Sequence, residues 1–114
     1  MDDVIYRLMD QQSWLEAKRT GMFSGSADDK RDGFIHFSTA ATVRETARRY
    51  YADIPDLMLI SVAVKDIEGH LKWEPSRGGV LFPHLYAPLS VSSIQTEQLL
   101  DRLENGHNFG PQIP

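Results

Sequence analysis

Short stretches of apolar, β-branched and aromatic side chains recur between polar segments of the chain, and this pattern predicts several short strands. Residues 4–9 (VIYRLM) are rich in β-branched and aromatic side chains and predict a first strand. Residues 57–64 (LMLISVAV) form the most apolar stretch, which is too short for a typical helix and predicts a central strand. Shorter patterns predict strands over residues 34–37, 71–74 and 93–100, although a helix stays open for the last of these.

The first predicted strand is followed by a helical pattern. Ser13 has the character of an N-cap residue, with Glu16 three positions later as its capping-box partner. Gly21 predicts the end of this helix, because glycine readily adopts the left-handed conformation found there. Residues 22–33 (MFSGSADDKRDG) are polar, charged and glycine-containing, and they predict a mobile loop.

A second short helix is predicted from Thr39, as its cap, to about Tyr51. Apolar side chains recur there at spacings of four and three residues, which places them on one helix face. This predicted inner face consists of Val43, Ala47 and Tyr50.

Prolines and glycines organise the C-terminal half. Residues 75–79 (PSRGG) predict a turn. Residues 80–89 are apolar but contain Pro83 and Pro88, which argues against both a helix and a regular central strand. The tail from residue 105 predicts a loop. The pattern as a whole predicts one α+β domain over residues 1–114, with a small split or mixed β-sheet and two short N-terminal helices.

Composition narrows the class of protein. The chain has 114 residues, 12 basic and 16 acidic side chains and no cysteine. The acidic balance argues against a dedicated binder of duplex nucleic acid, and the lack of cysteine excludes disulfides and cysteine-ligated zinc. No apolar run is long enough to span a membrane, and no signal-peptide pattern is present. We therefore expect a cytoplasmic protein without a membrane partner.

A first group of candidate functional residues lies at the end of the predicted strand at residues 34–37. Alternation along a strand places His36 and Ser38 on the same face, just before a predicted helix N-terminus. Such a terminus favours an anion or a polarised ligand oxygen. The alternative is structural: His36 binds a loop, and Ser38 or Thr39 only caps the helix.

A second group lies within residues 73–89. Glu74, Arg77, His84 and Tyr86 are clustered among aromatic residues and prolines, and the stiff backbone suits a site that holds its side chains still. Arg77 precedes two glycines and could approach a phosphate closely. The alternative is again structural, with Glu74 and Arg77 as a surface ion pair and the aromatic rings as packing.

Other chemistries fit less well. A hydrolase triad could combine Ser38 and Asp32 with His36 or His84, but the sequence has no Gly-x-Ser-x-Gly nucleophile elbow. The histidines and Glu74 lack the spacing of a known zinc motif, so no metal site is predicted.

The two groups resemble the motifs of a bacterial family catalogued as domain of unknown function 952. The resemblance rests on the segments FIHFST at residues 34–39 and FPHLY at residues 82–86, and it extends over nearly the whole chain. The family usually has glycine where this chain has Ala87. Its fold is thought to resemble that of the ADP-ribosyltransferase superfamily, which includes RNA 2′-phosphotransferases and binds NAD in a cleft between two small sheets.

This resemblance implies roles for individual residues and makes NAD the candidate cofactor. His36 with Ser38 would hold a ribose, a nearby aromatic ring would stack on a flat base, and Glu74 would supply the acidic group. The candidate catalytic residues are Glu74, His36 and His84. The candidate ligand-binding residues are Ser38, Tyr50, Trp73, Arg77 and Tyr86.

Two hypotheses follow from these residues. The first is an enzyme of ADP-ribosyltransferase type that binds NAD or a phosphorylated ribose. The second is a non-catalytic domain that binds a small molecule on the same fold. A purely structural interaction module would not explain the polar cluster, and it should show an exposed apolar patch instead. Whichever holds, we expect the two motifs to meet at one cleft, because an imidazole and a phenol are costly to bury without partners.

Overall fold

The computed structural model describes residues 2–104, 106–110 and 113, and the side chain of Arg77 lies outside the described part. The described residues form the α-helices α1 (Gln11–Thr20), α2 (Ala27–Asp32) and α3 (Val43–Tyr50). Their strands are β1 (Val4–Asp10), β2 (Met22–Phe23), β3 (Ile35–His36), β4 (Leu57–Ala63), β5 (Leu71–Pro75), β6 (Leu81–Leu85), β7 (Leu89–Ser90), β8 (Ile94–Leu99), β9 (Asp101–Leu103) and β10 (Gly106–Asn108). Their 3₁₀ turns are η1 (Val64–Asp66), η2 (Glu68–His70), η3 (Arg77–Gly79) and η4 (Val91–Ser93).

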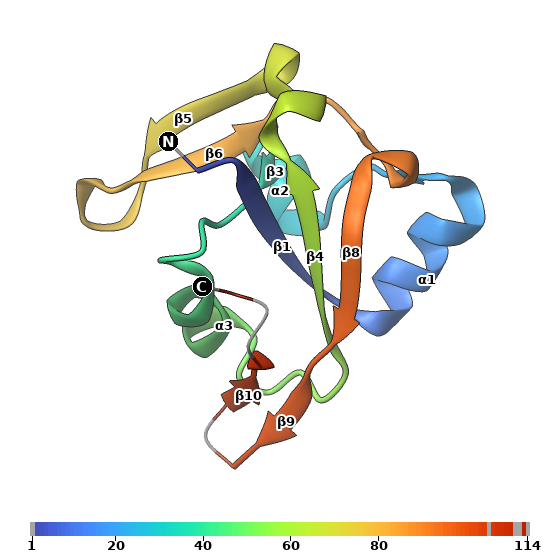
Figure 1. Ribbon diagram of the computed structural model, residues 1–114, viewed down its shortest axis with the longest axis vertical. Coiled ribbons are helices and arrows are strands. Elements are labelled where there is room, and N and C mark those ends of the chain that lie inside the picture. Colours follow the sequence, from blue (N-terminus) through green and yellow to red (C-terminus); the bar gives the residue numbers. More distant parts are fainter. Residues whose placement is uncertain (1, 105, 111–112, 114) are drawn as a thin grey trace.

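The central sheet has the strand order β1-β4-β8 and is antiparallel throughout. Every residue of β4 is buried, which agrees with a strand that is covered on both faces (Figure 1). The α+β class is therefore confirmed, and so is the central strand predicted at residues 57–64, which ends one residue earlier, at Ala63. No helix of the described residues is long and apolar enough to cross a membrane.

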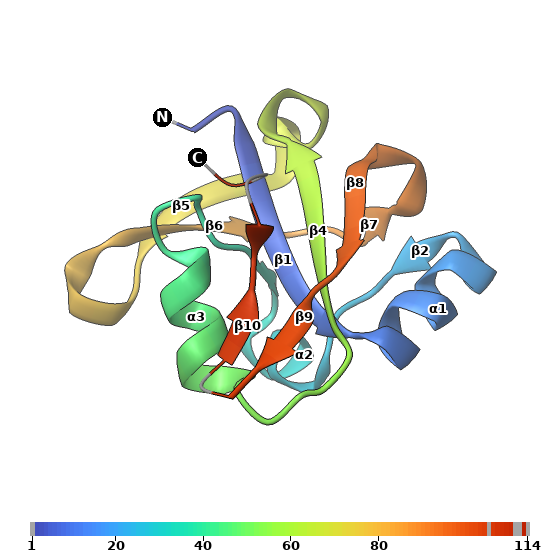
Figure 2. The same ribbon diagram turned by 60° about the horizontal axis from the view of Figure 1, so that its bottom comes forward.

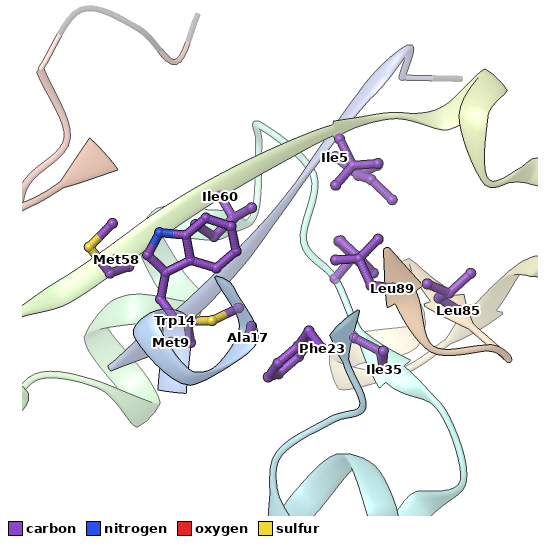
Figure 3. Close-up of a cluster of buried hydrophobic side chains, with 12 residues drawn as sticks. Ile5, Met9, Trp14, Ala17, Phe23, Ile35, Met58, Ile60, Leu85 and Leu89 are labelled. Carbon is purple, nitrogen blue, oxygen red and sulfur yellow. The ribbon is translucent and has the colours of Figure 1, made fainter. Parts of the chain in front are cut away.

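One face of the central sheet carries the larger core cluster. The side chains of Ile5, Met58 and Ile60 pack there against Trp14 of α1. Figure 3 shows the Trp14 indole beside Ile60 and Met58, with Phe23 farther along the same cluster. The alternation of β1 and β4 brings these residues to one face, because Ile5 lies opposite Val62 and Met9 opposite Met58 in the register.

The other face packs against α3 and the C-terminal segment. Leu8 and Leu59 contact a second cluster that contains Val43 of α3 together with Phe109 and Ile113. Figure 2 shows α1 and α3 on opposite sides of the central strands. Val43 and Ala47 are thus on the inner face as predicted, whereas Tyr50 is 63% exposed because it lies at the end of the helix.

A second sheet, with the order β3-β6-β5, crosses one end of the central sheet (Figure 1). Its register places His36 directly opposite His84, and Glu74 opposite Phe82. Alternation along β5 turns Trp73 to the other face, where it packs against the larger core cluster. This sheet therefore brings the two sequence motifs side by side.

The structure corrects the prediction for residues 80–89. Leu81–Leu85 forms β6, the middle strand of its sheet, although it contains Pro83. The Pro83 carbonyl still accepts a hydrogen bond from the Phe37 amide at 3.0 Å. Proline has no amide hydrogen to donate to the neighbouring strand. It is tolerated here because β3 ends at His36, so only one hydrogen bond between the strands is missing. The tail prediction is also wrong in part, since Gly106–Asn108 forms β10, paired with β9.

The predicted helix starts are wrong by part of a turn. Asp10 caps α1, since its carboxylate accepts a hydrogen bond from the Ser13 amide at 2.6 Å, whereas Gly21 ends the helix as predicted. Helix α3 begins at Val43, whose amide donates to the Thr39 carbonyl at 2.9 Å. The Thr39 side chain therefore does not act as the predicted cap.

Residues 22–33 are not the predicted loop. They form β2 and α2, and α2 begins with a capping box between Ser26 and Asp29. The capping-box pair Ser-x-x-Asp is a weaker helix signal than Ser-x-x-Glu, and the helix itself has only six residues. Gly33 ends the helix in the left-handed conformation, with φ of 86°.

The packing generates a prediction for stability. Ile60 is fully buried between β1 and β8, so the Ile60→Ala variant should lose about 3 kcal/mol of unfolding free energy through lost transfer energy and cavity formation. Urea unfolding monitored by circular dichroism measures this change. Leu15→Ala, at a position that is 53% exposed on α1, is the matched control and should change stability by less than about 0.5 kcal/mol. Equal losses in both variants would contradict the described core.

Candidate functional site

A cleft of about 300 Å³ lies where β1, α2, β3, α3 and β6 meet. Its lining includes the candidate residues His36, Ser38, Tyr50 and His84. His36 and Ser38 come from the first motif and His84 from the second. The prediction that His36 and Ser38 border a cleft is therefore confirmed.

A buried ion pair forms the floor of the cleft. Arg7 projects from the middle of β1, and its Nη1 lies 2.8 Å from Oδ1 of Asp29, which is 2% exposed. Oδ1 of Asp29 also accepts the His36 amide at 3.0 Å, and Oδ2 accepts the Ser26 amide at 2.7 Å and the Ser26 hydroxyl at 3.0 Å. Burial alone would raise the pKa of Asp29, but the hydrogen bond from His36 and the charge of Arg7 together hold this pKa well below its usual range.

His36 is held between two carboxylates of α2. Its Nδ1 lies 2.6 Å from Oδ1 of Asp29, and its Nε2 lies 2.9 Å from Oδ2 of Asp32. An ionised carboxylate only accepts hydrogen bonds, so each of these contacts is a hydrogen bond when the ring nitrogen in it carries a proton. The hydrogen bonds to Arg31, and secondarily the contact with His36, lower the pKa of Asp32. The Asp32 contact lies at the rim, where a ligand oxygen could take its place.

His84 is held by a different carboxylate. Its Nδ1 lies 2.8 Å from Oε1 of Glu74, and the Tyr86 hydroxyl donates to the same oxygen at 2.7 Å. The hydrogen bond from Tyr86, followed by that from His84, lowers the pKa of Glu74. The same bond to Glu74 raises the pKa of Tyr86. Glu74, His84 and Tyr86 therefore form one hydrogen-bonded group.

Phe34 connects the two histidine groups. Its ring stacks on His84 at a centroid distance of 4.0 Å and lies 4.6 Å from the His36 ring. The two imidazoles are 5.6 Å apart in an edge-to-face arrangement. The prediction that His36 and the His84–Tyr86 pair approach each other across one cleft is confirmed for His84, and this approach follows from the register of β3 and β6, whereas Tyr86 does not line the cleft.

The remaining candidate residues are more scattered. The Ser38 hydroxyl donates to the Thr46 hydroxyl at 3.2 Å, and Ser38 pairs with Tyr6 of β1 through its backbone. Tyr50 lies on the rim, whereas Trp73 is turned into the core and does not line the cleft. Arg77 is the one candidate whose side chain lies outside the described part of the chain.

Arg7 and Asp29 are cleft residues that the sequence patterns did not predict. A charged residue within the apolar stretch of β1 is a signal of a buried ion pair, because a strand covered on both faces rarely contains an unpaired charge. Tyr51 was also missed. It lines the cleft, and burial raises the pKa of its hydroxyl. Among the described residues, no group of three or more histidine and carboxylate side chains could hold a metal ion.

The comparisons with known proteins agree with the motif resemblance. The model of a family described as "Protein of unknown function (DUF952)" matches residues 8–97. A crystal structure of protein CC0527 from Caulobacter crescentus and one of its double mutant are each 42% identical, with a TM-score of 0.90, over 94% of this chain and 95% of theirs. A solution NMR structure of the same protein has a TM-score of 0.83 over 93% of this chain and 91% of that one. No curated protein matches the sequence.

The buried ion pair generates a prediction for the Asp29→Asn variant. The change removes the negative charge opposite Arg7 and leaves that guanidinium buried without its partner. Unfolding free energy should fall by about 3 kcal/mol, as is usual when one half of a buried pair is removed. Asp28→Asn, at an exposed position of the same helix, is the control and should cost less than about 1 kcal/mol in urea unfolding. Equal effects would argue against a structural role for Asp29.

The pKa of Asp29 generates a second prediction. Its folded-state pKa lies below the unfolded value of about 4, so its contribution to stability is present above about pH 4 and is lost as the pH falls toward the folded value. Urea unfolding at a series of acidic pH values should show a steeper loss of stability in the wild type than in Asp29→Asn. Parallel pH profiles of the two proteins would contradict this assignment.

Proposed function

The chain belongs to the DUF952 family, and from the geometry of its cleft we propose that it binds a ribose-containing nucleotide, with NAD as the first candidate, as an enzyme of ADP-ribosyltransferase type. The observation that carries this proposal is the pairing of His36 and His84, with rings 5.6 Å apart, in one cleft. Imidazole groups at this spacing can act on neighbouring oxygens of one small ligand.

The polar groups of the cleft suit the hydroxyls of a sugar. His36 offers a donor to a ribose oxygen once Asp32 moves aside, and the displaced Asp32 carboxylate can accept a hydrogen bond from a ribose hydroxyl in turn. Ser38 also lines the cleft and carries a hydroxyl. A ligand that contains several hydroxyls would satisfy all three side chains together.

The walls suit a flat ring. Tyr50 from α3 and Phe82 from β6 both line the cleft, so an aromatic base can pack against their side chains. Three aspartates also line the cleft, and two of them, Asp28 and Asp32, are exposed. When the bond between a ribose and its base breaks, positive charge develops on the sugar, and carboxylates at this position would stabilise it.

A non-catalytic binding domain is the second candidate, and one observation favours it. Glu74, the carboxylate that the family resemblance suggests for catalysis, does not line the cleft and bonds to His84 and Tyr86 instead. The protein would then keep the ligand site without a carboxylate dedicated to the reaction.

Isothermal titration calorimetry with NAD tests the proposal. The wild type should bind NAD, and His36→Ala should weaken binding by about tenfold or more, as expected for a lost hydrogen bond in a partly buried site. His70→Ala is the matched control, because His70 is exposed and outside the cleft, and it should bind as the wild type does. Absence of binding, or equal losses in both variants, would contradict the proposal.

A second measurement separates the two candidates. Mass spectrometry of NAD incubated with the protein should detect released nicotinamide if the protein is an enzyme. If the protein binds NAD but releases no nicotinamide, either in water alone or with added nucleophiles that could accept the ADP-ribosyl group, the result would favour the non-catalytic domain.

A further inference from the structure

Glu74 is placed to act on His84 rather than on a ligand. It does not line the cleft, and its Oε1 accepts hydrogen bonds from both His84 Nδ1 and the Tyr86 hydroxyl, at 2.8 and 2.7 Å. Two donors on one oxygen fix the position of that oxygen. The hydrogen bond from Tyr86 lowers the pKa of Glu74, so the carboxyl group stays ionised and acts only as an acceptor.

The orientation of the His84 ring is fixed from several sides. The side chain is 7% exposed, one face stacks on Phe34 with 21° between the ring planes, and the His36 ring approaches at 70°. Nδ1 is directed at Glu74, which lies outside the cleft lining, whereas His84 itself belongs to that lining. Among the described residues, no hydrogen-bond partner is found for Nε2, so this nitrogen is the polar atom of the ring that is left for a ligand.

We propose that Glu74 and Tyr86 are positioning residues, which hold His84 with its proton on Nδ1. The lone pair of Nε2 then faces the cleft and accepts a hydrogen bond from a ligand hydroxyl. Because an ionised carboxylate cannot donate, His84 must donate through Nδ1, and the neutral ring then has its lone pair on Nε2. Orientation of a histidine by a carboxylate is the same device that fixes the tautomer in hydrolase triads.

The two histidines then have opposite roles. His36 faces a carboxylate through each nitrogen and offers a donor from a nitrogen that carries a proton, whereas His84 is an acceptor at Nε2. A hydroxyl that donates to His84 and lies beside an oxygen that accepts from His36 fits this pair. The site therefore favours a ligand with free neighbouring hydroxyls, such as an unmodified ribose. The statement about the ligand rests on the proposed function, whereas the statement about the tautomer of His84 does not.

Long-range ¹H–¹⁵N NMR on the ¹⁵N-labelled protein, at mildly alkaline pH, tests the tautomer directly. In the wild type, Nδ1 of His84 should have the chemical shift of a protonated nitrogen, and Nε2 that of an unprotonated one. In Glu74→Ala the proton should redistribute toward Nε2. Glu74→Gln retains an acceptor oxygen and should keep the wild-type tautomer, so it controls for the loss of side-chain volume. Glu68→Ala, at an exposed position on η2, should also leave the His84 shifts unchanged.

A protonated Nε2 in the wild type would overturn the proposal, and so would His84 shifts that are the same in Glu74→Ala as in the wild type. If Glu74→Ala does not fold, as judged by its ¹H–¹⁵N correlation spectrum, the wild type and Glu74→Gln still decide the question through the tautomer each shows.

Titration with NAD tests the statement about the ligand. Glu74→Ala should weaken NAD binding by about tenfold, whereas Glu74→Gln should stay within about threefold of the wild type. Failure of the wild type to bind NAD would reject the proposed function alone, and the NMR result would still stand. NAD affinity that is unchanged in Glu74→Ala, together with a changed tautomer, would show that His84 does not contact the ligand and would overturn this part of the proposal.

Discussion

The carboxylate of Asp29 is the constraint on which the site depends. It is buried at the floor of the cleft and joins three elements through Arg7 of β1, which is 22 positions away, Ser26 at the start of α2, and His36 of β3. A buried charge is tolerated only when its partners compensate for the lost hydration. Since α2 has only six residues, it depends on this anchor more than on its own helix propensity.

The positions of the other cleft residues follow from this anchor. Asp29 accepts hydrogen bonds from both the backbone amide and Nδ1 of His36, so it fixes the strand and the imidazole together. The register of β3 and β6 then places His84 opposite His36, and Phe34 fills the space between the two rings. A second carboxylate, Glu74, holds His84 from the far side. The cleft thus has two histidines that contact separate carboxylates, Asp29 and Asp32 for His36 and Glu74 for His84.

Much of this arrangement could be predicted from local patterns, and the rest could not for physical reasons. Side-chain composition identified β1 and the continuous apolar run identified β4, whereas alternation predicted the shared face of His36 and Ser38. The need to satisfy buried polar groups predicted that the two motifs meet. The ion pair between Arg7 and Asp29 is a contact over 22 positions, and no local periodicity reports it. Asp29 lies in a polar segment that has the composition of a loop, so its helix was not predicted. Pro83 argued against a middle strand, but the strand forms because the hydrogen-bond donor that proline lacks is not needed where β3 ends.

A double-mutant cycle between Asp29 and His36 tests most directly whether this carboxylate positions the imidazole. Unfolding free energies of the wild type, Asp29→Asn, His36→Ala and the double variant give the coupling between the two side chains. Contact at 2.6 Å between His36 Nδ1 and Asp29 Oδ1 predicts a coupling of about 1 kcal/mol or more. Additive effects, within about 0.3 kcal/mol, would show that the two side chains act independently and would contradict the account.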